Sequence, residues 1–150
     1  MPMTPDDIRL VRHHFATLSG QEEAFSAAFY DHLFALAPDL RAYFPRDMAD
    51  QGRKLMAVLH FAMAHLDRAE TLAPAVIALG ARHAEYGVRP DQFAPVGAAL
   101  LQVLDQWLGA AFDARARQVW ISLYGALADL MRQGLLSAAP RAARLAKAAP

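Results

Sequence analysis

Apolar residues recur at steps of three and four along most of the 150-residue chain, which is the spacing of one face of an α-helix. No segment shows the sustained apolar–polar alternation that is typical of a strand. The pattern predicts a short helical turn over residues 38–44 and longer helices over residues 5–18, 21–37, 48–66, 72–87, 92–108 and 114–136. We therefore expect an all-α protein of about seven helices of unequal length.

Residues that cap helices stand before most of these segments. Thr4 precedes Pro5 at the start of the first helix, in the order that is typical of a capped N-terminus. Four later helices are expected to be capped in the same way, by Asp47, Thr71, Asp91 and Asp113. Proline-bearing corners between helices of unequal length favour an irregular sandwich of helices over an up-and-down bundle.

The last residues differ in composition from the rest of the chain. Segment 138–150 is rich in alanine and basic residues, and Leu145 is its only large apolar residue. One apolar anchor is too little for a helix that lies on a membrane surface, so a solvated tail is favoured. We expect one domain over residues 1–137, followed by a flexible tail over residues 138–150.

Composition and charge exclude several classes of protein. Hydrophobic residues make up 55% of the chain and the formal net charge is +0, as expected of a packed globular domain. The lack of a basic excess argues against nucleic acid as a partner, and the lack of cysteine excludes disulfides, thiolate metal sites and thiol catalysis. Because no apolar run reaches the length of a membrane span and the N-terminal residues do not resemble a signal peptide, we expect no membrane association and a cytoplasmic location.

His83 is the first candidate for chemistry, because it is a lone polar side chain on an apolar helix face. Leu72, Val76, Leu79 and Tyr86 share that face at helical steps, so the imidazole is expected to point toward the core. A buried imidazole needs a partner. Two interpretations are open at this point: a core histidine that is bonded to a backbone carbonyl, or an axial ligand to a haem iron, which asks for one strong protein ligand.

Four local strings carry a resemblance to a known family. They are FYDHLFALAPDLRAYF (29–44), DQGRKLMAVL (50–59), LGARHAEYGV (79–88) and WISLYGALADLM (120–131). In this order and nearly without gaps, they resemble the globin domain of flavohaemoglobins and the related single-domain bacterial globins. The resemblance extends from about Met3 to Leu136, and it implies a globin fold around one haem b.

The proximal side of the haem is implied by position in these strings. His83 matches the proximal histidine that binds the iron, and Phe44 matches the phenylalanine that packs against the haem plane. The chain departs from the flavohaemoglobin pattern at Phe93 and Leu135, which stand where that pattern has a tyrosine and a glutamate. We expect the imidazole to bond only a backbone carbonyl, such as that of Leu79, and to donate less charge to the iron than a carboxylate-bonded histidine does.

The distal side is implied in the same way. Tyr30 and Gln51 match the tyrosine and glutamine that meet a bound gas, and Leu55 matches the apolar residue beside them. Gln51 and Leu55 are four residues apart, so they share one helix face. Alone, each polar residue has an ordinary explanation as a core tyrosine or a solvated glutamine, but together with the proximal match they favour a haem pocket. Lys54 and Arg53 are candidates for contact with a haem propionate or are solvated surface residues.

Three functions share these residues. The first is reversible binding or storage of O2 and other diatomic gases (NO, CO) at a pentacoordinate or weakly hexacoordinate iron. The second is nitric oxide dioxygenation, with Tyr30 and Gln51 as the catalytic pair and a separate reductase, since the chain has no glycine-rich phosphate loop. The third is a gas or redox sensor, for which we expect an output domain that this chain does not encode. The apolar proximal side favours binding, and a haem-free helical scaffold is the remaining alternative.

Overall fold

The computed structural model describes residues 3–148, with side chains for residues 3–138. Within that part of the chain every regular element is helical, so the predicted all-α class is confirmed. Six α-helices and the short 3-10 helix η1 make up the seven main elements, and η2 and η3 are single turns. The elements are α1 (Pro5–Ala16), α2 (Glu22–Leu36), η1 (Pro38–Tyr43), α3 (Ala49–Ala64), α4 (Ala69–Glu85), η2 (Pro90–Gln92), α5 (Phe93–Leu108), η3 (Gly109–Ala111) and α6 (Ala114–Ala148).

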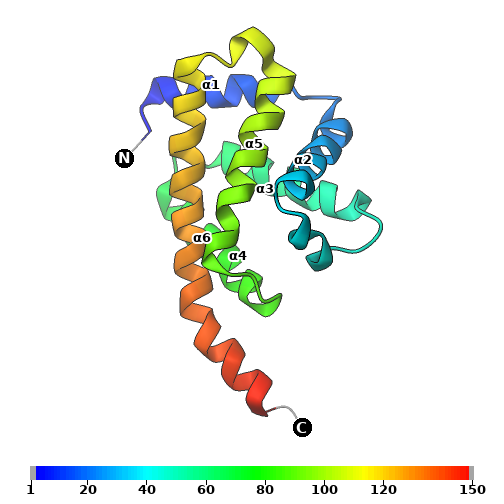
Figure 1. The fold of residues 1–150 in the computed structure, drawn as a ribbon. Coiled ribbons are helices and arrows are strands. Elements are labelled where there is room, and N and C mark those ends of the chain that lie inside the picture. The colour runs from blue at the N-terminus through cyan, green and yellow to red at the C-terminus, as the bar shows by residue number, and fades with distance from the viewer. Residues whose placement is uncertain (1–2, 149–150) are drawn as a thin grey trace.

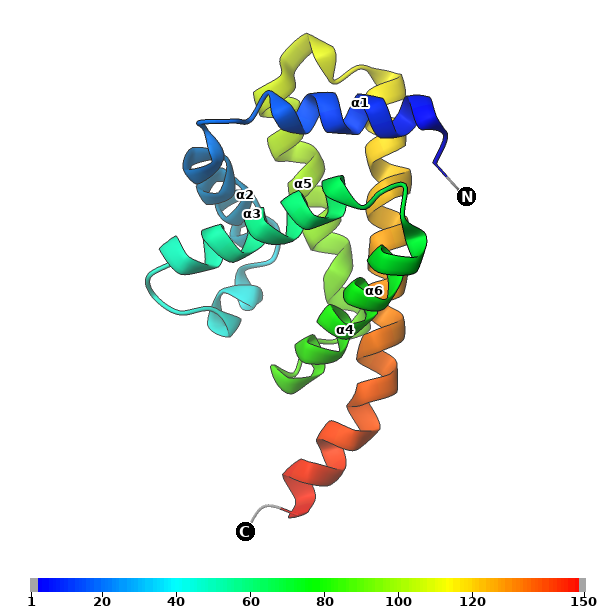
Figure 2. The ribbon, with the colours of Figure 1, turned by 180° about the vertical axis from the view of Figure 1, so that it is seen from behind.

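The helices cross at varied angles and do not form a parallel bundle, as Figures 1 and 2 show from opposite sides. Helix α4 packs along α6, α2 packs on α5, and α1 lies across the end of the molecule where α5 connects to α6. The main hydrophobic core joins α1, α2, α3, α5 and α6. Its most deeply buried side chains include Val11, Leu18, Phe25, Leu33, Val103 and Leu104.

A smaller cluster determines how α3 and α4 lie relative to each other. Ala62 near the end of α3 packs with Leu72 and Val76 in the first half of α4. The two helices therefore meet where one ends and the other begins. The residues predicted for the site lie toward the other two ends, at the start of α3 and the end of α4.

Two predicted caps, Thr4 and Asp113, are confirmed, and Asp47 also bonds the start of its helix, although Met48 occupies the N-cap position. The Thr4 hydroxyl accepts from the backbone N–H of Asp7, and the Asp7 carboxylate accepts from the N–H of Thr4, which is a complete capping box. The carboxylate of Asp47 accepts from the N–H of Ala49 at 2.9 Å. In the same way, an oxygen of Asp113 accepts from the N–H of residue 116 at 2.8 Å.

Two predicted caps are wrong. Helix α4 begins at Ala69 and contains both Thr71 and Pro74, so Thr71 does not cap it. Asp91 lies within the 3-10 turn η2, and the side-chain oxygen of Gln92 accepts from the backbone N–H of Arg89 instead. In both places the helix starts at a residue other than the one that the cap residue indicates.

The last helix is longer than predicted. The sequence predicts an end at Leu136, whereas α6 runs from Ala114 to Ala148. The side chains of residues 139–150 lie outside the described residues, so the flexibility of the tail over residues 138–150 stays a prediction. Among the described residues, no helix is both long enough and apolar enough to cross a membrane.

Two glycines allow the backbones of α4 and α6 to come into direct contact. A Cβ atom at Gly80 would overlap the backbone carbonyl of Met131, and a Cβ atom at Gly134 would overlap the carbonyl of Ile77. Because α4 carries His83, the lack of side chains at these two crossing points sets the position of the imidazole relative to α6.

We expect Gly134→Ala to lower the free energy of unfolding by about 2–3 kcal/mol, since backbone atoms on both sides cannot move aside as a flexible side chain could. Gly125→Ala on the same helix is the matched control. Nothing lies within 4 Å of a Cβ atom at Gly125, so its better helix propensity should leave stability equal or up to about 1 kcal/mol higher. Urea unfolding of both variants measures the difference, and equal stabilities would contradict the close approach.

Candidate functional site

Tyr30 and Gln51 lie together, although they come from different helices. Tyr30 is on α2 and is only 5% exposed, and Gln51 is on the first turn of α3. The side-chain amide of Gln51 donates to the Tyr30 hydroxyl oxygen at 3.1 Å. The Tyr30 ring also packs edge to face on Phe44, with ring centroids 5.5 Å apart. The predicted distal pair and the predicted plane-packing phenylalanine therefore form one group.

The hydroxyl of Tyr30 is available as a hydrogen-bond donor. Its oxygen accepts from Gln51, so its own hydrogen is free to point elsewhere. Burial raises the pKa of Tyr30, and the hydrogen bond from Gln51 opposes this only in part. The phenol therefore stays protonated throughout the neutral range.

On the other side, His83 makes the hydrogen bond that the sequence predicts. Its Nδ1 lies 2.7 Å from the carbonyl oxygen of Leu79, one turn earlier on α4. Since a carbonyl can only accept, Nδ1 carries the proton and the neutral ring keeps a lone pair on Nε2. Among the described residues no group hydrogen-bonds this Nε2. The side chain is half-buried, where the sequence predicts a fully inward position.

The space behind His83 is apolar. The ring of Phe93, at the start of α5, lies 6.1 Å from the imidazole, centroid to centroid. Phe93 and Leu135 belong to one small buried cluster, in which they are 5% and 2% exposed. The hydroxyl of Tyr124 donates to the backbone carbonyl of Phe93 at 2.5 Å and so points to the backbone, away from the imidazole nitrogen. The two apolar departures predicted from the sequence thus lie in one buried cluster, and Phe93 is the member that lies near the imidazole.

The remaining predicted residues divide between core and surface. Leu55 is partly buried against the main core, as expected of an apolar pocket residue. Lys54 and Arg53 are exposed, and Arg53 pairs with Asp50 one turn earlier. Tyr86 is 68% exposed, so its predicted place on the inward face is wrong. Helix α4 ends at Glu85, and the helical period cannot be extended beyond its end.

Sequence reasoning missed three residues. Phe34 stacks on Tyr30 at 5.9 Å and lies 5.4 Å from Phe44, centroid to centroid, which completes the aromatic group. Its spacing of four residues from Tyr30 is the signal that could have found it. Tyr43 and the buried Gln92 hydrogen-bond to each other at 3.3 Å. They are 49 residues apart in sequence, and no local pattern links them.

Comparison with known proteins identifies this arrangement. A family model described as Globin matches residues 27–131. The chain belongs to the globin family. The sequence-based resemblance is therefore confirmed, and the globin fold accounts for the crossed helices.

Globin relatives in sequence include two neuroglobins. That of Tetraodon nigroviridis is 28% identical and that of Chaenocephalus aceratus is 29% identical, each over 146 aligned residues that cover 88% of this chain and 92% of the neuroglobin. The structure of a bacterial globin from Campylobacter jejuni superimposes with a TM-score of 0.78 at 20% identity, covering 89% of this chain and 97% of the other. This structural likeness shows a shared fold.

A globin implies a haem cofactor, and the residues present fit one. The free lone pair on Nε2 of His83 is the kind of donor that a haem iron takes from a globin. The hydroxyl of Tyr30 on α2 accepts from Gln51 on α3, and its own hydrogen is not used within the protein. Among the described side chains, no hydrogen bond or ring contact joins the Tyr30 group directly to the His83 group. The chemistry of both groups suits a flat, iron-bearing cofactor between them.

Proposed function

We propose that this globin binds haem b through His83 and reversibly holds O2, and also NO and CO, beside Tyr30 and Gln51. The observations that support this are the hydrogen bond from the Gln51 amide to the Tyr30 oxygen and a histidine, His83, whose Nε2 makes no hydrogen bond among the described residues. Haem iron, when bound, supplies an open coordination position for a diatomic gas. The side chains of this protein then hold the cofactor and stabilise the bound gas.

The two distal side chains have different tasks in this proposal. Tyr30 is the donor that faces the gas, because its hydrogen is not used within the protein. Gln51 holds the Tyr30 oxygen in place and polarises its O–H bond by donating to it. The rings of Phe34 and Phe44 hold the Tyr30 ring from two sides and keep bulk water away from its hydroxyl.

The proximal side favours binding over oxidation chemistry. The Nδ1–H of His83 donates to a neutral carbonyl, and the nearby ring of Phe93 belongs to an apolar cluster with Leu135. A neutral partner makes the imidazole a weaker electron donor than a carboxylate partner would. Nitric oxide dioxygenation with a separate reductase is the second candidate, since the protonated Tyr30 hydroxyl would serve it equally well.

Two measurements test the proposal. The purified protein, reconstituted with haem and then separated from unbound haem, should carry a Soret band that shifts when CO is added to the ferrous form, and the lack of a protein-bound Soret band would overturn the proposal. Consumption of nitric oxide should then be followed over many turnovers with a generic flavin reductase supplied. A single stoichiometric burst favours binding, whereas sustained nitrate production would establish the enzyme.

The proximal interpretation makes a spectroscopic prediction. The iron–histidine stretching frequency of the ferrous protein is expected to be lower than in flavohaemoglobins, because Leu79 offers only a carbonyl to Nδ1. Adding the missing polar groups with Phe93→Tyr and Leu135→Glu should raise it. Leu136→Glu is the control, since that neighbouring side chain is 58% exposed. Resonance Raman measures all three proteins, and a wild-type frequency as high as in flavohaemoglobins would contradict the expectation.

A further inference from the structure

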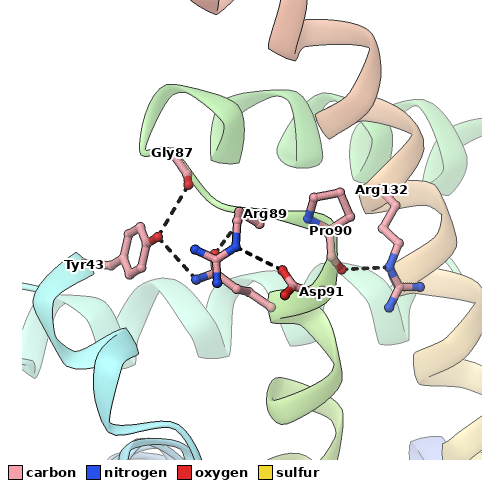
Figure 3. A network of polar contacts seen from close by, with 7 residues as sticks. Tyr43, Gly87, Arg89, Pro90, Asp91 and Arg132 are labelled. Carbon is pink, nitrogen blue, oxygen red and sulfur yellow. Dashed lines mark hydrogen bonds and ion pairs between the residues drawn. The ribbon is translucent and has the colours of Figure 1, made fainter.

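The Tyr43 hydroxyl connects two segments that are otherwise separate. It donates to the backbone carbonyl of Gly87 at 3.4 Å and accepts from the side-chain amide of Gln92 at 3.3 Å. Figure 3 shows the phenol reaching from η1 to the connection between α4 and α5. We call these two hydrogen bonds the Tyr43 bridge. Among the described residues, no other hydrogen bond joins η1 or α3 to that connection.

The far side of the Tyr43 bridge is anchored to the rest of the molecule. The guanidinium of Arg132 on α6 donates to the carbonyl of Pro90 at 3.2 Å, and it lies over the ring of Phe93 at 5.7 Å. Gln92 is 7% exposed, and its oxygen accepts from the N–H of Arg89 at 2.7 Å. The α4–α5 connection is therefore held on α6, whereas η1 packs on α2 and places Leu40 in the main core. The Tyr43 bridge joins these two parts of the molecule by hydrogen bonds.

Two residues of the Tyr43 bridge lie next to residues of the proposed haem site, and the third follows the helix that carries His83. Tyr43 directly precedes Phe44, and Gln92 directly precedes Phe93. Gly87 follows the end of the helix that carries His83, and its positive φ of 78° directs the chain out of that helix. Restraining the bridge therefore restrains the distance between the Phe44 side of the site and the His83 side.

The bridge also stands at an opening in the surface. A hollow of about 380 Å³ is lined by Ala42, Tyr43 and Tyr86, which come from η1 and from the end of α4. Tyr43 is 37% exposed, and both hydrogen bonds of its hydroxyl are made to the protein. Separation of η1 from the α4–α5 connection would widen this hollow.

We propose that Tyr43 is a positioning residue, which ties η1 to the α4–α5 connection and slows the loss of haem. This inference rests on the proposed function, because it needs haem between the Phe44 and His83 groups. Tyr43 touches neither the iron nor the gas in this account. It acts by keeping Phe44 at a constant distance from the helix of His83.

The test compares Tyr43→Phe with Tyr86→Phe in the haem-loaded, ferric protein. Tyr86→Phe is the matched control, since that side chain lines the same hollow but makes no hydrogen bond among the described residues. The rate of haemin transfer to an excess of apomyoglobin is expected to rise about three- to tenfold in Tyr43→Phe, the factor expected for loss of one or two ordinary hydrogen bonds. The control should lose haemin at the wild-type rate.

Amide hydrogen exchange separates positioning from general destabilisation. In Tyr43→Phe, exchange should speed up in η1 and over residues 86–92, while the amides of Val103 and Leu104 in the core keep their wild-type rates. Faster exchange in the core by the same factor would overturn the positioning role, as would unchanged haemin loss from a variant that holds haem. A wild-type protein that takes up no haem would instead overturn the proposed function, and this inference with it.

Discussion

His83→Ala is expected to leave a folded protein that no longer retains haem. Residues around a metal site that do not even touch the metal are worth about 10–100-fold in metal affinity, so loss of the ligand itself should cost more than that. The Soret absorbance at one equivalent of haem measures this loss. Added free imidazole should restore much of the band, because it can occupy the space that the His83 side chain leaves.

Of the other five histidines, the structure engages four in contacts elsewhere, and the fifth, His13, is exposed on α1. His14 is 3% exposed, and its Nδ1 accepts from the indole N–H of Trp120 at 3.1 Å. Burial, and the neighbouring His13, lower the pKa of His14, which keeps it neutral in this contact. The other contacts lie on the surface: His32 with Gln106, His60 with Glu22, and His65 with the carbonyl of Phe61.

The control for this substitution is His60→Ala. His60 is a half-exposed histidine whose Nε2 pairs with Glu22 at 2.8 Å, so its removal should leave the Soret band unchanged. An undiminished Soret band in His83→Ala would contradict the ligand assignment. Loss of the band in both variants would show general damage to the fold, which circular dichroism of the apoproteins would reveal.

The parts of the fold that the sequence predicts correctly are set by local chemistry. A capping side chain and the N–H that it satisfies lie two or three residues apart, so Thr4, Asp47 and Asp113 can be recognised in the sequence. The Leu79 carbonyl is likewise one helical turn from His83, and this bond follows from the helix alone. Local patterns are sufficient where both partners belong to one element.

Prediction from the local sequence fails where contacts with another segment determine the structure. Thr71 is a good cap residue, yet α4 starts earlier because Leu72 and Val76 pack on Ala62 of α3 as part of a helix that is already formed. Pairing of Tyr43 with Gln92 depends on how η1 and the α4–α5 connection meet in space. The main residues on both sides of the candidate site were accessible through the family resemblance, and the bridge between the two sides was accessible only through the fold.

Removal of the distal donors is expected to speed the escape of O2. Hydrogen bonds to a charged acceptor are worth about 1.5–3 kcal/mol, so Tyr30→Phe should raise the O2 dissociation rate about 10–100-fold. Gln51→Leu should have a smaller effect, because the Gln51 amide reaches the Tyr30 oxygen and supports the donor from behind. Stopped-flow displacement of O2 by CO measures both rates.

The double variant and a second gas decide whether the two residues act as one unit. Because Gln51 donates to Tyr30, the free-energy effects of Tyr30→Phe and Gln51→Leu should sum to more than the effect of the double variant. CO dissociation should change far less than O2 dissociation in each variant, since bound CO carries little negative charge for a donor to stabilise. Equal effects on both gases would indicate that the substitutions changed the shape of the pocket, and not that a hydrogen bond to the gas was lost. Additive effects would mean that Gln51 donates to the gas on its own, and would contradict the supporting role assigned to it here.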